Sequence, residues 1–254
     1  GYKKTYGHVL VIGGDHGFGG APMMTAQGAG HAGAGLVSLA TRSEHVAPLL
    51  ARQPEIMARA VDGVADLAPL LEQATVVAVG PGLGRDAWGR ALLEAALDSG
   101  LPLVVDADAL TLIAEWGVDA RDDWVLTPHP GEAARLLGSD TGAIQANRFA
   151  AVESLAARYG GTALLKGLGT LVRGAEGAAL ISDGNPGMGS GGMGDLLTGV
   201  IAALRAQGLA PYRAAALGAM AHARAADRAA ARDGERGLLA TDLLMDLRRE
   251  LNEH

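Results

Sequence analysis

Cysteine is absent from this sequence, which excludes a disulfide-stabilised scaffold and metal sites built on thiolates. Aromatic residues make up only 4% of the 254 residues, so a core must be built mainly from aliphatic side chains and alanine. Basic residues are not in excess: 21 lysines and arginines against 28 aspartates and glutamates give a formal net charge of −7, which argues against a nucleic-acid-binding surface. Apolar runs stay below the ~18 residues that a membrane span requires. We therefore expect a cytoplasmic protein that binds neither nucleic acids nor membranes.

Glycine and short apolar runs are abundant instead, with 38 glycines and a hydrophobic content of 49%. Apolar runs alternate with helical patterns, which predicts an α/β fold with a mostly parallel sheet and helices on both faces. The predicted strands are His8–Ile12, Leu36–Ala40, Thr75–Val79, Leu101–Val105, Trp124–Leu126 and Ala163–Lys166, with a ribbon over Leu171–Arg173 and Ala178–Ser182. The predicted helices include Ala21–Ala34, Trp88–Leu97, Tyr212–Arg232 and Thr241–Leu251.

The chain shows no linker or internal repeat that would divide it, so residues 1–254 are expected to form a single domain. The first residue is Gly1 rather than methionine. We therefore expect this domain to be part of a longer chain.

The stretch from Asn185 to Gly208 carries the strongest functional signal. Five glycines fall within eight residues, at positions 187, 189, 191, 192 and 194, and Asp195 follows at once. Apolar residues then recur at three- and four-residue steps, which predicts an amphipathic helix. A glycine-rich start to a helix exposes backbone N–H groups to an anion, and the helix dipole adds roughly +0.5 charge there. We therefore predict an anion site at this loop, with Asp195 beside it as a candidate base.

Two nucleotide-binding motifs are excluded in this stretch. Gly189, Gly191 and Gly194 satisfy GxGxxG, but no strand precedes them, so the dinucleotide fingerprint lacks its context. No lysine stands in a GxxxxGK[ST] pattern. The alternative is a plain loop whose Asp195 caps the helix, although a cap does not need five glycines. A helix N-terminus is also expected to lower the pKa of Asp195, which would favour a role in orientation over proton abstraction.

Three further glycine loops adjoin predicted strands, at residues 13–20, 80–84 and 166–170. Each can be a simple turn into the next element. In an open parallel sheet, however, the carboxyl ends of the strands share one edge, and ligands bind there. We therefore expect the glycine loops to face one another along that edge.

Carboxylates follow two other predicted strands. Asp106 and Asp108 lie one residue apart, a spacing that suits either Mg²⁺ held through water or the cap of the next helix. We expect Asp106 in the site and Asp108 at the cap. Glu132 lies three residues after His129, but the prolines on both sides of the histidine disfavour a helical metal pair. Pro130 is expected in the first turn of the helix that contains Glu132.

Five motifs together resemble one known family, the nucleotide-dependent NAD(P)H-hydrate dehydratases of the ribokinase-like superfamily. In the family's order they are GPGLG at 80–84, DADAL at 106–110, TPHPGEAARLLG at 127–138, KGLGT at 166–170 and GMGSGGMGDLLTGV at 187–200. The resemblance extends from about His8 to Leu247. Gly189 replaces the usual alanine and Met193 a frequent small hydroxyl residue, and neither change removes a backbone N–H. The resemblance implies a ribokinase-like three-layer α/β/α fold.

The resemblance also implies roles for individual residues. Asp195 would be the catalytic base. The backbone groups of the anion hole would belong to Gly191, Gly192 and Gly194. The residues implied to contact the hydrated dinucleotide are Ala21, Gly84, His129 and Asp195. The residues implied to contact the nucleotide are Lys166, Gly167, Leu168, Gly169, Thr170 and Gly194. Magnesium would be held by Glu132 and, through water, by Asp106.

The implied reaction is metabolite repair, in which NADH or NADPH that has gained water is dehydrated at the expense of ADP or ATP with Mg²⁺. Relatives of this kind imply a homotetramer and often an N-terminal epimerase domain. A kinase for a hydroxymethyl-pyrimidine or thiazole shares the loop and the fold, and it remains an alternative. A non-catalytic nucleotide-binding module is a third possibility, but a carboxylate that faces phosphate, Asp195, argues against it.

Overall fold

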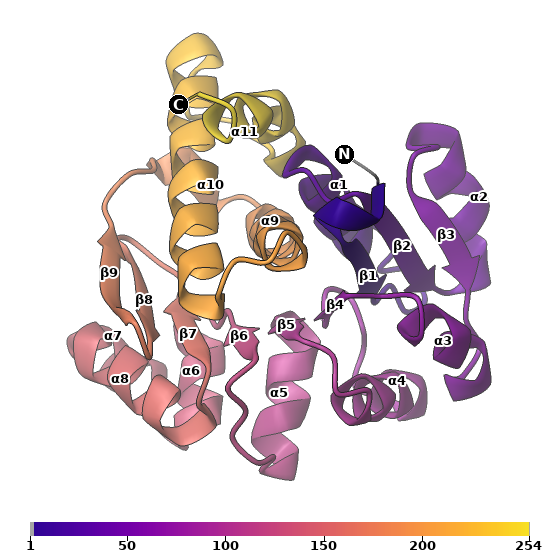
Figure 1. Ribbon diagram of the computed structural model, residues 1–254. Helices are drawn as coiled ribbons and strands as arrows, with labels where there is room; N and C mark the ends of the chain where they lie inside the picture. The colour runs from indigo at the N-terminus through magenta and orange to yellow at the C-terminus, as the bar shows by residue number, and fades with distance from the viewer. Residues whose placement is uncertain (1–2, 254) are drawn as a thin grey trace.

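The structure of the protein is a computed structural model that describes residues 3–253 (Figure 1). Gly1, on which the expectation of a longer chain rests, lies outside the described residues. The centre is a nine-stranded sheet with the order β3-β2-β1-β4-β5-β6-β7-β8-β9. In chain order the strands are β1 His8–Ile12, β2 Leu36–Thr41, β3 Met57–Ala60, β4 Val76–Val79, β5 Leu103–Val105, β6 Trp124–Leu126, β7 Thr162–Leu165, β8 Thr170–Gly174 and β9 Gly177–Ile181.

The strand directions confirm the predicted sheet. Strands β1 to β7 pair in parallel, with His8 opposite Leu36 and Val9 opposite Val76 on the two sides of β1. Strands β8 and β9 form the predicted antiparallel ribbon at the end of the sheet. The chain builds outward from β1 in one direction and then, from β4, in the other. The switch point between β1 and β4 is where such sheets form a ligand crevice.

Helices cover both faces of the sheet, which confirms the three-layer arrangement (Figure 1). In chain order they are α1 Gly20–His31, α2 Ser43–Arg52, α3 Val64–Leu71, α4 Ala87–Asp98, α5 Ala107–Trp116, α6 Pro130–Leu137, α7 Thr141–Ala146, α8 Arg148–Tyr159, α9 Met193–Ala206, α10 Pro211–Asp233 and α11 Leu244–Glu250. Single 3-10 turns are η1 Lys3–Tyr6, η2 Pro186–Gly189 and η3 Ala240–Leu243. Within residues 3–253, no helix is both long and apolar enough to cross a membrane.

The inner strands are mainly apolar because both of their faces are buried. In β1, Val9 and Val11 pack into the core shared with α1, α9 and α10, whereas Leu10 and Ile12 pack into the core shared with α4 and α5. This alternation follows from the two-residue period of a strand. Alanines and glycines on α10, such as Gly218 against Ile201, let this helix lie close to α9. The low aromatic content is thus accommodated by close helix packing.

Element boundaries differ from the sequence expectations by a few residues. Helix α1 ends at His31 rather than Ala34, and Gly33 follows with φ +91°. Strand β5 begins at Leu103, after Pro102, rather than at Leu101. The segment 42–74 contains α2, β3 and α3, which no sequence pattern predicted. The prolines inside α2 and α3 and the weakly apolar strand MARA explain this omission.

Candidate active site

The glycine loops come together at the edge where the parallel strands end, as expected. The amide of Gly14, after β1, donates to the carbonyl of Gly82, after β4, at 2.9 Å. The amide of Gly84 donates to Oδ2 of Asp108 at 3.0 Å, which joins this loop to α5. The amide of Lys166 donates to the carbonyl of Pro128 at 2.9 Å, which joins the loop after β7 to the one before α6. The loops on both sides of the switch point therefore form one continuous edge.

A buried ion pair lies at the centre of this edge. Nζ of Lys166 donates to Oδ1 of Asp106 at 2.6 Å, and Oδ2 of Asp106 accepts from the hydroxyl of Thr198 at 2.9 Å. Asp106 is 1% exposed, and the Lys166 side chain is 20% exposed. Burial alone would raise the pKa of Asp106, but Lys166 and Thr198 hold it below its usual value. The pair is therefore ionised, with the lysine on the solvent side.

The start of α9 is open to an anion. Its N-cap is Gly192, at φ +90°, and this residue has no side chain to satisfy the first amide groups. A Cβ at Gly192 would lie 2.3 Å from Sδ of Met24, and the positive φ of this residue favours glycine there. A Cβ at Gly194 would meet Nζ of Lys166 at 3.0 Å. The uncapped amides and the lysine therefore lie next to each other, which suits a phosphate group.

Asp195 lies in the first turn of α9 and is half-buried. Burial is the main reason that its pKa rises to about 6, and the negative charges of Asp106 and Asp108 raise it further, against the opposing effect of Lys166. The expectation of a lowered pKa at this helix terminus was therefore wrong. Burial and the neighbouring carboxylates outweigh the helix dipole. The shift makes Asp195 a better proton acceptor than an exposed aspartate.

His129 and Glu132 form the start of α6 as a capping pair. Nδ1 of His129 accepts from the amide of Gly131 at 3.0 Å, and Oε2 of Glu132 accepts from the amide of His129 at 2.7 Å. Pro130 takes the first helical position, as predicted. Glu132 is buried, and this raises its pKa to about 7 despite Lys166, whose Nζ lies 4.0 Å from Oε2. A cation bound nearby would stabilise the ionised form of this carboxylate.

No group of three His, Cys, Asp or Glu side chains in residues 3–253 is arranged to hold a metal ion. Magnesium, however, commonly uses only one or two carboxylates together with waters and substrate phosphates. Glu132 fits that use because its contacts with positively charged groups are weak: Nζ of Lys166 is bonded to Asp106 and lies 4.0 Å from Oε2, and Nε2 of His129, which is charged only when protonated, lies 3.4 Å from Oε1. Asp106 fits less well than the sequence predicted, since Lys166 and Thr198 already bond its two oxygens.

The loop 166–170 is held from α8. The guanidinium of Arg148 donates to the carbonyls of Leu165 at 3.2 Å and Lys166 at 3.3 Å, and also to that of Leu168. The Leu168 side chain is 99% exposed, and Gly167 and Gly169 have positive φ. The loop therefore presents backbone groups and one apolar side chain to solvent beside Lys166.

Comparisons with known proteins agree with this geometry. The family model described as NAD(P)H-hydrate dehydratase matches residues 9–249. The chain belongs to the NAD(P)H-hydrate dehydratase family. It is 52% identical to the bifunctional NAD(P)H-hydrate repair enzyme of Coxiella burnetii, over 97% of this chain and 51% of the relative. The chain thus spans about half the length of the curated relatives it matches.

Two solved structures of similar fold extend this comparison. A ribokinase-like superfamily protein of Enterococcus faecalis matches with a TM-score of 0.90 and 31% identity, over 99% of this chain and 89% of that one. The ADP/ATP-dependent NAD(P)H-hydrate dehydratase of Bacillus subtilis, co-crystallised with ATP and Mg²⁺, matches with a TM-score of 0.88 and 25% identity, over 99% and 91%. The expected ribokinase-like fold of this dehydratase-family chain is therefore confirmed.

The remaining predicted residues of this family member lie along the same edge. Ala21 is the second residue of α1, and a Cβ on Gly82 would lie 3.4 Å from the Ala21 Cβ. Gly84 has its amide engaged by Asp108, so that amide is already satisfied. The expected capping role of Asp108 was wrong: Asp106 is the N-cap residue of α5, and Asp108 lies in the first turn and supports the loop 80–84. Asp108 is the second residue of α5, which is close enough to the helix start to be mistaken for the cap in the sequence.

Two residues of the site were missed by sequence reasoning. Thr198 is fully buried on the apolar face of α9, and a polar residue among Leu197 and Val200 was a usable signal. Arg148 begins α8 far along the chain from the loop that it holds, and nothing in the local pattern indicated that contact.

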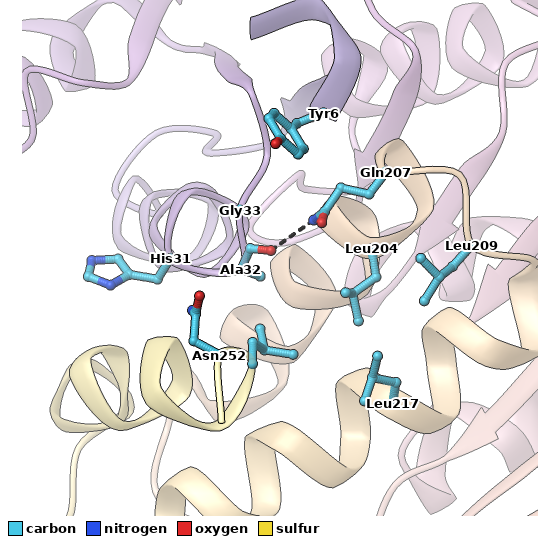
Figure 2. A pocket seen from close by; sticks show the side chains of 10 residues that line it. Tyr6, His31, Ala32, Gly33, Leu204, Gln207, Leu209, Leu217 and Asn252 are labelled. Atoms are coloured by element: carbon cyan, nitrogen blue, oxygen red, sulfur yellow. Dashed lines mark hydrogen bonds between the residues drawn. The ribbon is translucent and has the colours of Figure 1, made fainter. Parts of the chain in front are cut away.

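A hollow of about 460 Å³ lies at the opposite edge, where β1 and β2 begin (Figure 2). Its lining includes Tyr6, His31 and Leu217. On one side of it, the side-chain Nε2 of Gln207 donates to the carbonyl of Ala32 at 2.8 Å. The glycine loops and the buried ion pair are at the other end of the strands. The hollow is therefore separate from the candidate active site.

Proposed function

We propose that this chain dehydrates hydrated NADH or NADPH at the expense of ADP or ATP, and releases the reduced dinucleotide, AMP or ADP, and phosphate. The observation that carries the proposal is the position of Asp195. It is a carboxylate with a raised pKa in the first turn of an uncapped helix, next to a lysine held at 3.0 Å from the Cβ position of Gly194. Phosphoryl transfer needs such a combination of base, anion-binding amides and positive charge.

The residues divide into two binding regions in this proposal. The hydrated nicotinamide lies between the switch-point loops and α6, in contact with Ala21, Gly84, His129 and Asp195. The nucleotide lies over the loop after β7, in contact with Lys166, Gly167, Leu168, Gly169, Thr170 and Gly194. The reacting hydroxyl and the terminal phosphate then meet at Asp195.

Asp195 accepts the proton of the ring hydroxyl while that oxygen attacks the terminal phosphorus. The bond between phosphorus and the departing nucleotide breaks, and the amides of Gly191, Gly192 and Gly194 stabilise the charge on the transferred group. The ring nitrogen then donates its electron pair, the carbon–oxygen bond breaks and phosphate leaves. Loss of a proton from the neighbouring ring carbon restores the dihydropyridine. Base catalysis of this kind contributes about 10²–10⁴-fold.

Magnesium fits Glu132, whose carboxylate has a pKa near 7 and gains from a cation. When bound, Mg²⁺ would supply charge neutralisation to the phosphates. Glu132 would hold it, directly or through water, and Asp106 would contribute mainly through Lys166. The hydrogen bond from the backbone amide of His129 to Oε2 of Glu132 keeps this carboxylate in place for that role.

The test is to mix the chain with hydrated NADH and either ADP or ATP, and to follow the near-ultraviolet absorbance of the reduced nicotinamide together with phosphate release. Recovery of absorbance that depends on the nucleotide supports the dehydratase. Nucleotide consumption with a phosphorylated ring and no recovery would instead identify a kinase. Nucleotide binding with no turnover would leave only a binding module.

We further propose a cytoplasmic homotetramer. Exposed apolar side chains such as Leu180, Leu239 and Met245 offer surface for packing between copies. Light scattering at micromolar concentration should give about four chain masses, and a single chain mass would contradict the tetramer.

A further inference from the structure

Asp106 occupies the position of a helix cap without acting as one. It is the N-cap residue of α5, but its side chain makes no hydrogen bond to that helix. An aspartate at this position ordinarily bonds the backbone of the first turn and contributes about 1 kcal/mol. Here its oxygens accept from Lys166 and Thr198, 60 and 92 positions away in the sequence. Asp106 therefore makes two long-range contacts in place of a local helix cap.

The backbone beside Asp106 is strained. Ala107 has φ +49°, and among residues 3–253 it is the one non-glycine residue with a positive φ. Such a conformation is unfavourable for alanine and persists only where surrounding contacts impose it. Both the strain and the unused cap are explained if the turn is built to direct Asp106 toward Lys166 and Thr198.

Thr198 connects this carboxylate to the start of α9. Its hydroxyl lies 2.9 Å from Oδ2 of Asp106 and 3.0 Å from the carbonyl of Gly194, one turn earlier in the same helix. A hydroxyl has a single proton to donate, and the bond to an ionised carboxylate is the stronger one. Thr198 therefore fastens the first turn of α9, which contains Asp195, to Asp106.

Lys166 completes the arrangement from a third segment of the chain. Its Nζ is bonded to Oδ1 of Asp106, and it lies 3.0 Å from the Cβ position of Gly194. An ammonium group has three donors, and only one is used by Asp106. The remaining donors stay available at the exposed side of the pair. One buried carboxylate thus fixes both the lysine and the helix start.

We propose that Asp106 and Thr198 are positioning residues, which hold Lys166 and the first turn of α9 in one fixed relative geometry. The proposal rests on the proposed function, because it matters only if Lys166 binds the nucleotide and Asp195 acts on the substrate. Neither residue touches the reacting atoms. In-line phosphoryl transfer depends on such alignment, and a misplacement of ~1 Å can cost ~10²-fold in rate.

The test compares three single substitutions. Thr198→Val keeps the shape of the side chain and removes the hydroxyl, whereas Thr198→Ser keeps the hydroxyl. Thr162→Val is the matched control, because Thr162 is equally buried at the far end of the strand that leads to Lys166. We expect Thr198→Val to lower kcat about tenfold or more, with nucleotide Kd within about twofold of wild type. Thr198→Ser and Thr162→Val should stay close to wild type in both quantities.

A readout that does not depend on turnover accompanies the kinetics. Hydrogen exchange followed by mass spectrometry should show faster exchange in the peptide that contains Asp195 for Thr198→Val, and unchanged exchange there for Thr198→Ser and Thr162→Val. Unchanged kcat and exchange in Thr198→Val would overturn the proposal. So would equal losses in the valine and serine variants. If wild type does not dehydrate hydrated NADH, the proposed function fails, and the exchange result alone decides whether Thr198 fixes the helix start.

Discussion

The two edges of the sheet gather different kinds of side chain. At the carboxyl edge, the ion pair of Asp106 and Lys166, together with Glu132 and Asp195, meets the uncapped start of α9. At the amino edge, a hollow of about 460 Å³ is lined by uncharged groups, apart from His31, whose pKa is lowered chiefly by burial. This hollow therefore lacks formal charges, whereas the carboxyl edge carries both the charged side chains and the glycine loops. Phosphate chemistry requires convergent donors and charge more than volume.

The largest loss of stability is expected when the buried ion pair at the carboxyl edge is broken. Lys166→Met leaves Asp106 buried without its counter-charge, which typically costs about 3–5 kcal/mol of unfolding free energy. Nucleotide affinity should fall with it. Urea unfolding and a nucleotide titration measure both effects.

The matched control breaks an exposed pair. Arg213, with its side chain 72% exposed, pairs with Glu176 at 2.8 Å. Arg213→Met should change the unfolding free energy by no more than about 1 kcal/mol, because exposed pairs contribute little. Equal effects in the two variants would remove the special status of the Asp106–Lys166 pair.

The rate of dehydration should depend on pH through Asp195. The pKa of this group is raised to about 6, and only its ionised form accepts a proton. The rate should therefore rise with pH and reach half its plateau near pH 6, with roughly a tenfold loss one unit below. A substitution at the amino edge, His31→Gln, should leave this profile unchanged.

The raised pKa of Asp195 makes stability change with pH in the direction opposite to the rate. A carboxyl group whose pKa is raised by folding stabilises the fold in its protonated form, and that contribution is lost as pH rises through about 6. Ionisation of Asp195 therefore activates the site while it weakens the fold. A plateau that extends unchanged well below pH 5 would contradict the role of Asp195 as the base.

A smaller effect is expected when a methyl group is added beside Lys166. Gly194→Ala places a Cβ at 3.0 Å from Nζ, so the lysine must shift, and nucleotide affinity should fall several-fold. Gly189→Ala is the control in the same loop, because its Cβ meets nothing within 4 Å. Isothermal titration calorimetry with ADP measures the nucleotide affinity of both variants. Equal affinities would show that the close approach of Gly194 to Lys166 has no part in binding.

The smallest effect belongs to the amino edge. Gly30 lies in α1 and lines a second hollow of about 440 Å³, which shares His31 and Gly33 with the first, and a Cβ on Gly30 meets nothing within 4 Å. Gly30→Ala should raise the unfolding free energy by about 0.5–1 kcal/mol, because alanine favours the helix. Thermal unfolding measures the gain, and turnover should be unaffected. A clear loss of turnover would mean that the amino edge takes part in catalysis.

The difference between the edges also explains what the sequence could reveal. Strands such as β1 and β4 were predictable because both faces are buried and nearly all of their residues are apolar. The helix after the glycine loop was predictable from its apolar spacing, and its start near Asp195 followed from the glycines. These are local signals, and the carboxyl edge carries most of them.

Contacts between distant segments were not predictable in this way. Asp106 was expected beside the site, but its bonds to Lys166 and Thr198 depend on three separate strand and helix ends. The raised pKa of Asp195 was missed for the same reason, since burial and neighbouring carboxylates exist only in the folded chain. The helix dipole, the one effect visible locally, is the weaker influence there.

The most direct test of the central claim is the turnover of Asp195→Asn with hydrated NADH at saturating ADP, measured beside a direct nucleotide titration. Asparagine retains the size and the capping ability of aspartate but accepts no proton. We predict that kcat falls by roughly 10²-fold or more, while nucleotide affinity holds or rises slightly because a negative charge near phosphate is removed. Near-normal turnover in this variant would contradict the account and leave the carboxyl edge as a binding site only.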